Sequence, residues 1–168
     1  MKRKKGFTLV EMIIYAAIFS AVSLLVVQSL LVITRSFGMI GLTRDINISA
    51  STAMERTVRE IRLASDIDVA NSIFDASPGR LKLNTVDALG APTTIEFFIN
   101  DAVLMIKEGT SAATALTSSS TEVTTLIFNN ITNSSISKAV KITFDIFKSK
   151  GSLQKSEKFY NTVILRGS

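Results

Sequence analysis

The sequence predicts an α+β fold, in which one long N-terminal helix packs on a C-terminal antiparallel β-sheet. Three observations lead to this prediction. A run of 23 residues without a charged side chain occupies positions 12–34, and apolar residues then recur three and four positions apart as far as Ala64. After Asp68 the period falls to two, which is typical of strands with one buried face.

The uncharged run is long enough to cross a membrane. As a helix, residues 12–34 would extend roughly 35 Å, whereas the hydrocarbon core of a bilayer is about 30 Å thick. A removable secretory signal is the alternative, but its apolar region should end after about 7–15 residues. Four basic residues precede the run: Lys2, Arg3, Lys4 and Lys5. Their charge favours a cytoplasmic N-terminus, with the C-terminal part on the other side of the membrane.

The helix is expected to continue as an amphipathic segment. Its apolar face carries Ile46, Ala50, Ala53, Met54, Val58, Ile61 and Ala64. The opposite face is charged, and we expect it to be solvated: Arg44, Glu55, Arg56, Arg59, Glu60 and Arg62. Ion pairs at the four-residue spacing of Arg56 and Glu60 add a few tenths of a kcal/mol to an isolated helix. The apolar face is thus available to cover a sheet.

The remainder of the chain predicts that sheet. Segments that alternate or are rich in β-branched and aromatic residues are 80–85, 93–99, 102–108, 122–128, 139–147 and 158–166. Turns at 77–80 and 89–92 and a tight hairpin at 100–101 separate some of them. Residues 110–121 form a loop that could hold a short strand at 114–117. Short connections favour an antiparallel sheet, and six phenylalanines are expected in its core: Phe97, Phe98, Phe128, Phe144, Phe147 and Phe159.

Composition argues against several function classes. The net charge is +5, but four of the 19 basic residues precede Gly6, which leaves 15 basic and 14 acidic residues after it. This near balance predicts no nucleic acid contact. The chain has no histidine and no cysteine, so it lacks the commonest general base and a thiolate nucleophile. We therefore expect no enzymatic activity, no catalytic residues and no cofactor.

One acidic cluster contains the kinds of side chain that bind calcium. Asp66, Asp68 and Asn71 offer oxygen ligands, but the glycine and terminal glutamate of an EF-hand loop are absent. A solvated helix end is the preferred interpretation, and no metal is expected.

The stretch KKGFTLVEM resembles the processing signal of type IV pilins and pseudopilins. A basic leader ends in Gly6, Phe7 follows, and Glu11 becomes the fifth residue of the mature chain, ahead of a long apolar helix. Over residues 3–34 the sequence itself is similar, whereas beyond residue 34 only the order of predicted elements is. The later segments MERTVREIRLAS, LTSSSTEVTTLIF and AVKITFDIF are similar to J-type minor pseudopilins and W-type minor pilins.

This resemblance implies processing by a prepilin peptidase, which cuts between Gly6 and Phe7 and methylates the new amino group of Phe7. Glycine suits such a cut because it lets the backbone enter a narrow cleft, although Gly6 could instead only punctuate the leader. The cut removes the basic cluster, which otherwise holds that end at the anionic cytoplasmic surface. Other implied partners are pilin or pseudopilin subunits, an inner-membrane assembly platform and membrane lipid.

Glu11 is the unusual residue of the membrane segment. A carboxylate costs about 2.5–3.5 kcal/mol at the centre of a membrane and less near an end. In the family its partner is the amino terminus at Phe7 of the neighbouring subunit, so that Glu11 selects the axial register of assembly. Alternatively, Glu11 reaches from one turn beyond the lysines into the lipid headgroups. Both roles can apply, before and after processing.

The predicted parts are a cleaved basic leader at 1–6, a transmembrane and assembly helix at 7–34, its amphipathic second half at 35–67, and a globular β-sheet domain at 68–168. The predicted function is a minor pilin or pseudopilin that primes or joins a type IV pilus or a type II secretion pseudopilus. Such a subunit is a single-pass inner-membrane protein whose C-terminal domain is periplasmic or extracellular, and it joins a surface filament after assembly. The sequence does not distinguish these two machines from a DNA-uptake system. The alternative is a single-pass protein that binds or senses a ligand without polymerising.

Overall fold

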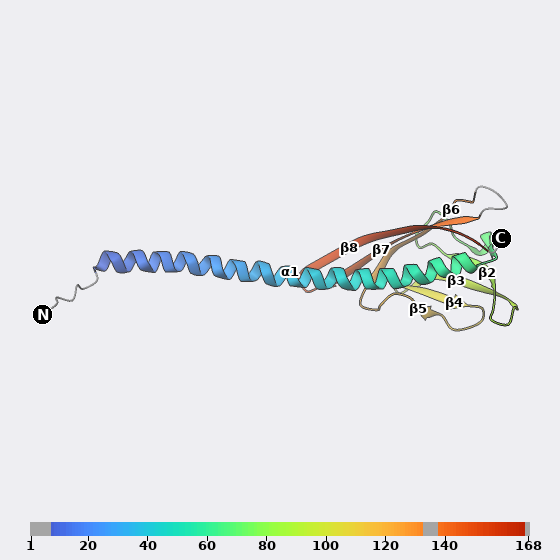
Figure 1. Ribbon diagram of the computed structural model, residues 1–168, viewed down its shortest axis with the longest axis horizontal. Helices are drawn as coiled ribbons and strands as arrows, with labels where there is room; N and C mark the ends of the chain where they lie inside the picture. The colour runs from blue at the N-terminus through green and yellow to red at the C-terminus, as the bar shows by residue number, and fades with distance from the viewer. Residues whose placement is uncertain (1–7, 133–137, 167–168) are drawn as a thin grey trace. The chain divides into compact units, whose positions relative to one another are not determined.

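The computed structural model describes residues 8–132 and 138–166. Their elements, in chain order, are α1 (Leu9–Leu63), β1 (Asp66–Ile67), the 3-10 helix η1 (Val69–Asn71), β2 (Leu81–Val86), β3 (Pro92–Asn100), β4 (Val103–Glu108), β5 (Thr114–Ala115), β6 (Glu122–Asn130), β7 (Ala139–Lys150) and β8 (Leu153–Ile164). This order confirms the predicted α+β fold (Figure 1). The chain divides into two compact units, the first ending at Ile40 and the second beginning at Gly41.

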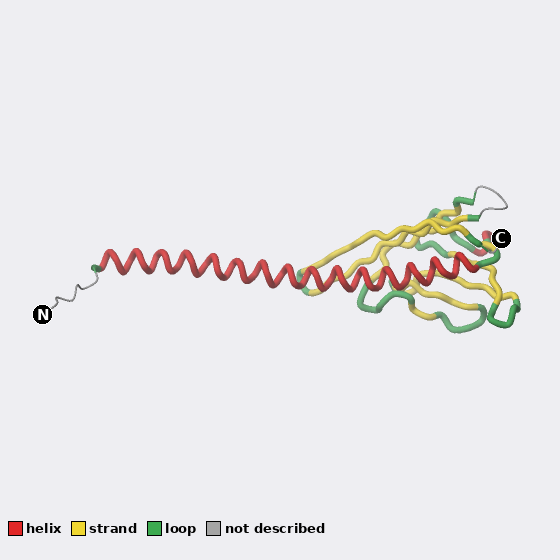
Figure 2. The backbone as a smooth tube through the Cα atoms, in the orientation of Figure 1, coloured by secondary structure: helices red, strands yellow, loops and turns green. Residues whose placement is uncertain are grey.

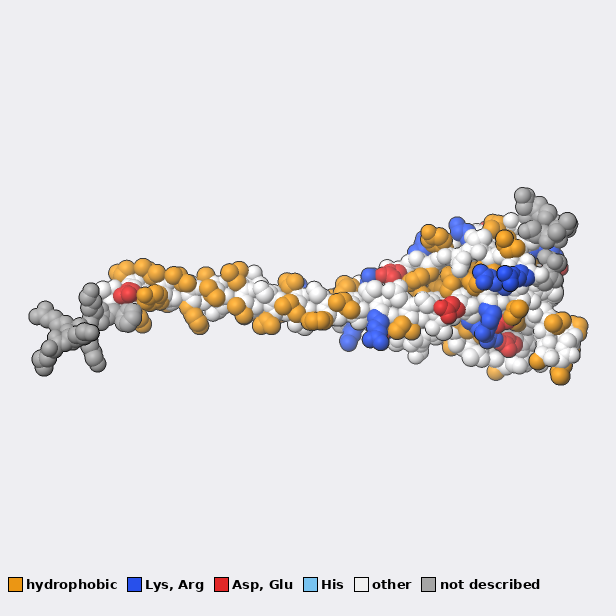
Figure 3. Space-filling view, in the orientation of Figure 1, with side chains coloured by type: hydrophobic (Ala, Val, Ile, Leu, Met, Phe, Trp, Pro, Cys, Tyr) orange, Lys and Arg blue, Asp and Glu red, His pale blue; other side chains and the backbone are white. Residues whose placement is uncertain are grey.

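In the first unit, α1 exposes apolar side chains on all sides. Every large hydrophobic residue from Leu9 to Ile33 is at least 50% exposed, and Figure 3 shows hydrophobic side chains at the surface along the visible face of this part of the helix. Four hydroxyl groups donate to the carbonyl oxygen four residues earlier, at 2.8–2.9 Å: Ser20, Ser29, Thr34 and Ser36. Such bonds satisfy the hydroxyls without water. The helix is long and apolar enough to cross a membrane, as predicted.

In the second unit, α1 buries the predicted apolar face. Ile46, Ala50, Ala53 and Ile61 are fully buried, and Met54 and Val58 pack against the same core. Small side chains on this face let the strands approach the helix closely.

Glu60 corrects the prediction of a solvated charged face. It is only 9% exposed, and its Oε1 lies 3.0 Å from Nε of Arg56 and 3.4 Å from Nε of Arg59. Arg56 in turn reaches Glu108 at the end of β4, with 2.5 Å between Nη2 and Oε1. Thr57 and Ile61 beside Glu60 are buried too, so the buried face of the helix is wider than the spacing of the apolar residues predicts.

The strands form two antiparallel sheets where the sequence predicted one. One sheet has the order β1-β2-β3-β4-β5, and the other has the order β6-β7-β8. Figure 2 shows the strands in yellow beside the helix in red. Alternate residues of both sheets form the core: Leu81, Leu83, Ile95, Phe97, Leu104, Ile106, Leu126, Phe128, Ile142, Phe144 and Ile146. Phe98 and Phe147 are exceptions to the predicted phenylalanine core, since they alternate with buried neighbours and are only half-buried.

The β3–β4 hairpin turns one residue later than predicted. Asn100 pairs with Val103, and the turn residues Asp101 and Ala102 both have positive φ, at 48° and 59°. Two positive φ values define the tight turn whose twist matches that of the flanking strands. Aspartate tolerates this conformation better than most residues do.

The predicted turn at 77–80 covers the outer edge of β6. The N–H of Gly79 donates to the Leu126 carbonyl at 2.7 Å, and the N–H of Leu126 donates to Oγ of Ser77 at 3.2 Å. A Cβ atom on Gly79 would lie only 3.0 Å from that carbonyl oxygen. Glycine is therefore needed here for close approach of two backbones.

The β7–β8 hairpin is longer than predicted. Its pairing continues beyond Phe147 to Lys150, which is opposite Leu153, and the turn contains Gly151 with a φ of 60°. The prediction stopped at Phe147 because the apolar alternation ends there. The Gly-Ser pair between the two strands was the turn signal that would have extended them.

Candidate functional site at the start of the long helix

The predicted processing residues do not fall within the described part of the chain. Gly6, Phe7 and the basic cluster of Lys2, Arg3, Lys4 and Lys5 lie outside the described residues. Glu11 is described, and the geometry of the site is therefore that of α1 from its first turn onward.

Thr8 and Glu11 begin the helix. The N–H of Glu11 donates to Oγ1 of Thr8 at 3.3 Å, and the N–H of Met12 donates to the Thr8 carbonyl at 3.2 Å. Thr8 immediately precedes Leu9, the first helical residue, so it is the N-cap and Glu11 is the third helical position. A threonine followed three residues later by glutamate is the sequence signature of a capping box. The sequence prediction missed this local role of the pair.

The Glu11 carboxylate is partly exposed. Its Oε1 accepts a hydrogen bond of 3.2 Å from the Tyr15 hydroxyl, one helical turn later. No basic side chain forms an ion pair with Glu11 anywhere in residues 8–132 and 138–166. An ionised carboxylate has about four acceptor positions. The group can thus still receive a cation from outside this part of the chain.

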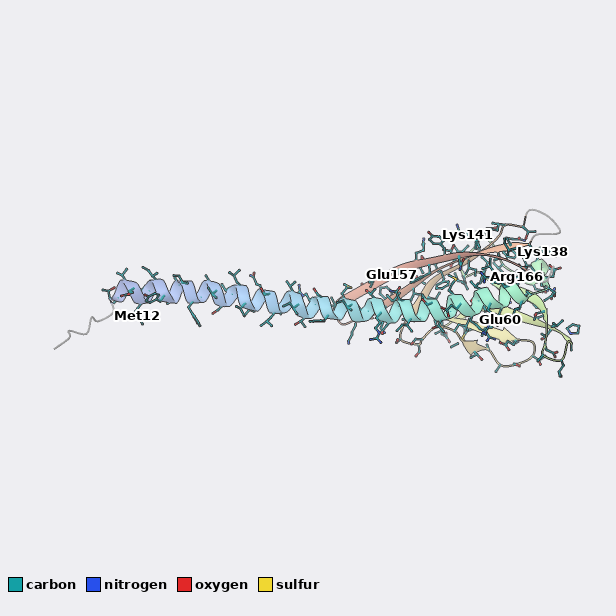
Figure 4. All side chains as sticks on the ribbon, viewed as in Figure 1. Met12, Glu60, Lys138, Lys141, Glu157 and Arg166 are labelled. Carbon is teal, nitrogen blue, oxygen red and sulfur yellow. The ribbon has the colours of Figure 1, made fainter. Side chains whose placement is uncertain are left out.

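The surroundings of Glu11 favour such a cation. Met12 is 59% exposed and Ile13 is 60% exposed, and Figure 4 shows Met12 at this end of the helix. The side chains beside Glu11 are thus apolar and lie on the surface of the chain. When lipid or other helices cover them, an unpaired carboxylate becomes costly, and a charged donor is the partner that compensates most.

The acidic cluster considered for metal has structural contacts of its own. Asp66 lies in β1 and accepts a hydrogen bond from Lys138, which lowers the pKa of the Asp66 carboxyl. Asp68 caps η1 and accepts from Nδ2 of Asn71 at 2.7 Å, and this bond lowers the pKa of Asp68. The predicted solvated helix end is therefore a short strand and a capped 3-10 turn. Within the described residues, no group of three or more acidic side chains could hold a metal ion.

Comparison with known families adds one finding. Residues 1–27 match the family model described as the prokaryotic N-terminal methylation motif. This match supports a type IV pilin-like protein. The motif implies, in general terms, cleavage by a prepilin peptidase and interaction with other pilin subunits.

No curated protein and no solved structure matches the chain. The matched stretch contains Glu11 and the first turns of α1, and the apolar helix that follows it is consistent with a membrane-anchored single-pass protein.

Proposed function

We propose that this pilin-like protein is a minor pilin or pseudopilin, which primes or joins a type IV pilus or a type II secretion pseudopilus. The observation that carries the proposal is the methylation motif over residues 1–27. The motif runs directly into a helix whose apolar side chains are not buried by the rest of the described chain. Among subfamilies, we propose the J-type pseudopilin and W-type minor pilin group, and the role is structural, not catalytic.

The exposed apolar surface of the first unit supports a change of surroundings during assembly. A surface of this size is unstable in water. The lipid of the inner membrane covers it before assembly, with the N-terminus in the cytoplasm and the second unit on the other side. Helices of neighbouring subunits cover it afterwards, once the prepilin peptidase has removed the basic leader and the assembly platform has lifted the subunit from the bilayer.

Glu11 is proposed to pair with the amino terminus at Phe7 of the neighbouring subunit. Its carboxylate receives one hydroxyl donor within the described chain, from Tyr15, and retains acceptor capacity for an ammonium group. In a helical bundle that excludes water, an unpaired carboxylate is strongly disfavoured. Only the axial register that brings the two charges together avoids this cost.

The first test concerns processing. When the full chain is co-expressed with a prepilin peptidase, mass spectrometry should find a mature chain that begins at Phe7 and carries one added methyl group. Gly6→Leu should block the cut, whereas Gly41→Leu should not, since no atom lies within 4 Å of a Cβ atom at position 41. An intact leader would contradict the pilin assignment and favour the binding or sensing alternative. A cut near residue 23 would contradict both and indicate a removable secretory signal.

The second test separates two roles of Glu11. Glu11→Gln retains a capping-box residue but removes the charge, so it should leave membrane insertion intact and reduce incorporation into filaments by tenfold or more. Tyr15→Phe, which removes only the hydroxyl donor, should have a much smaller effect. The measurement is the fraction of the subunit recovered with sheared filaments. Normal incorporation of Glu11→Gln would show that the residue serves only to start the helix.

A further inference from the structure

The β7–β8 hairpin is attached to α1 at both of its ends. The N–H of Arg166, just after β8, donates to the carbonyl of Arg62 at 3.1 Å. Near the turn, Nζ of Lys148 donates to Oδ2 of Asp45 at 2.6 Å. The hairpin therefore runs along the second-unit part of α1 and turns near the first residues of that unit (Figure 1).

The turn extends past these attachments toward Gly41. Lys155 donates to Oγ1 of Thr43 at 3.0 Å, and the pairing then continues to Lys150 opposite Leu153. The two further residues of β7 add about 7 Å at the rise of an extended strand. The turn thus lies at the end of the second unit where that unit begins in the sequence, at Gly41, just after the apolar run.

The turn is basic. Residues 148–155 include three lysines and no acidic residue. Lys148 and Lys155 contact α1, whereas Lys150 is exposed and forms no ion pair with any described residue. Arg44 on the adjacent turn of α1 is likewise exposed and unpaired within the described chain. Two cations, Lys150 and Arg44, are therefore available to an anionic surface.

Two acidic side chains close to this turn are engaged by lysines, and a third, Glu122, lies opposite Phe147 on the neighbouring strand β6. Asp45 pairs with Lys148, and Glu157 lies 2.8 Å from Nζ of Lys155. The hydrogen bond from Lys148 lowers the pKa of Asp45, so this pairing holds at neutral pH. The charges of Arg44 and Lys150 also lower the pKa of Asp45, to a smaller extent than Lys148 does. The three lysines of the turn and Arg44 outnumber the acidic side chains near them, so the turn keeps an excess of positive charge.

The chain length keeps this basic turn near the membrane. Thr43 comes nine residues after Thr34, the last residue of the uncharged run. These residues belong to α1, which is helical from Leu9 to Leu63, and nine helical residues rise about 14 Å. The headgroup layer adds about 5–8 Å beyond the hydrocarbon core, and charges act over about 8–10 Å at physiological ionic strength.

We propose that the β7–β8 turn, with Lys150 and Arg44, contacts anionic lipid headgroups of the membrane that holds the apolar run. The inference rests on the membrane anchor of the proposed function. The turn residues Ser149, Gly151 and Ser152 are small or polar, so the contact is electrostatic and reversible. It would hold the second unit against the membrane until the subunit is lifted out.

The test uses the full chain in lipid vesicles. Because the chain contains no cysteine, Ser152→Cys provides a single site for a fluorophore at the turn. The vesicles contain phosphatidylcholine, with or without phosphatidylglycerol, and a quencher attached to headgroups in both leaflets. Quenching should be stronger with phosphatidylglycerol and should fall to the neutral-lipid level in high salt.

Lys150→Glu should remove most of the lipid dependence, since one lysine near an anionic surface changes binding by about fivefold. Lys141→Glu is the matched control, because it makes the same change of charge on β7 near the opposite end of the hairpin (Figure 4). Protease resistance of the second unit checks that both variants fold.

Two failures are distinguishable in this experiment. A chain that does not float with either kind of vesicle would contradict the membrane anchor and, with it, the proposed function. A chain that floats but shows the same quenching in neutral and anionic vesicles would overturn the lipid contact alone. Equal loss of quenching in Lys150→Glu and Lys141→Glu would also overturn it, because the effect would then be one of net charge.

Discussion

The two parts of α1 place the same kinds of side chain in opposite environments. Ile18 in the first unit is 57% exposed, whereas Ile46 and Ile61 in the second unit are completely buried. Both parts belong to one continuous helix, so backbone hydrogen bonding does not distinguish them. A helix that is apolar on all sides needs lipid or other proteins around it, while a helix with one apolar face needs only its own domain.

The two units therefore differ in what stabilises them. The second unit buries a core of its own, in which Phe144 and Phe159 pack with ring centroids 5.8 Å apart. The described residues of the first unit bury no large hydrophobic side chain in the chain itself. Substitutions of similar chemistry should therefore have different effects in the two units.

Phenylalanine truncation should show the largest difference. Phe144→Ala empties a fully buried position and should lower the free energy of unfolding of the second unit by about 3–5 kcal/mol. Phe19→Ala removes the same atoms from a side chain that is 74% exposed and should not change that free energy. Pulse proteolysis of the detergent-solubilised chain in increasing urea measures both. Equal destabilisation would mean that the first unit is packed against the protein.

An introduced carboxylate should impair membrane insertion in the first unit but not in the second. Leu25→Asp, in the middle of the apolar run, should make insertion less favourable by about 2.5–3.5 kcal/mol. Ile48→Asp is the control, since Leu25 and Ile48 are similarly exposed in the chain, at 64% and 55%. The fraction of the chain that resists alkaline extraction from membranes should fall for Leu25→Asp only. A normal fraction would place residue 25 outside the bilayer.

Loss of the surface ion pair between Lys138 and Asp66 should have the smallest effect on the free energy of unfolding. The pKa of Asp66 is lowered from 3.8 by its bond to Lys138, so the folded state holds its proton less tightly than the unfolded state does. The stabilisation is therefore present above that value and is lost as the pH falls through the lower, folded-state pKa. Since the Asp66 side chain is 47% exposed, Lys138→Met should cost less than about 1 kcal/mol at neutral pH.

Urea unfolding at several pH values measures this contribution, with Lys141→Met as the control for loss of a lysine. The difference between Lys138→Met and the unaltered chain should vanish in acid, whereas Lys141→Met should show no such change. A difference that persists at low pH would assign the effect of Lys138 to packing instead of charge.

Features that depend on neighbouring residues could be predicted from the sequence. The apolar run, the buried face of the second half of α1 and most strand positions follow from spacing, because periods of 3.6 and two are local properties of the chain. The methylation motif is local too, and so is the capping box of Thr8 and Glu11, whose three-residue spacing can be recognised in the sequence.

Features that depend on distant contacts could not be predicted in this way. Glu60 has the helical position of a solvated residue, yet it is buried and pairs with Arg56, which also reaches Glu108 of β4. The division into two sheets and the extent of β7 and β8 likewise depend on hydrogen bonds between strands far apart in the sequence. At Glu11, the described part of the chain supplies the Tyr15 hydroxyl but no cation.

An apolar helix, a methylation motif and a domain of strands can all be recognised in the sequence, since each is encoded in residues a few positions apart. Which charges are buried, and the position of the basic β7–β8 turn beside the first residues of the second unit, depend on the folded chain. Burial and charge pairing are set by residues that meet in space, and folding brings Lys148 to Asp45 across 103 positions.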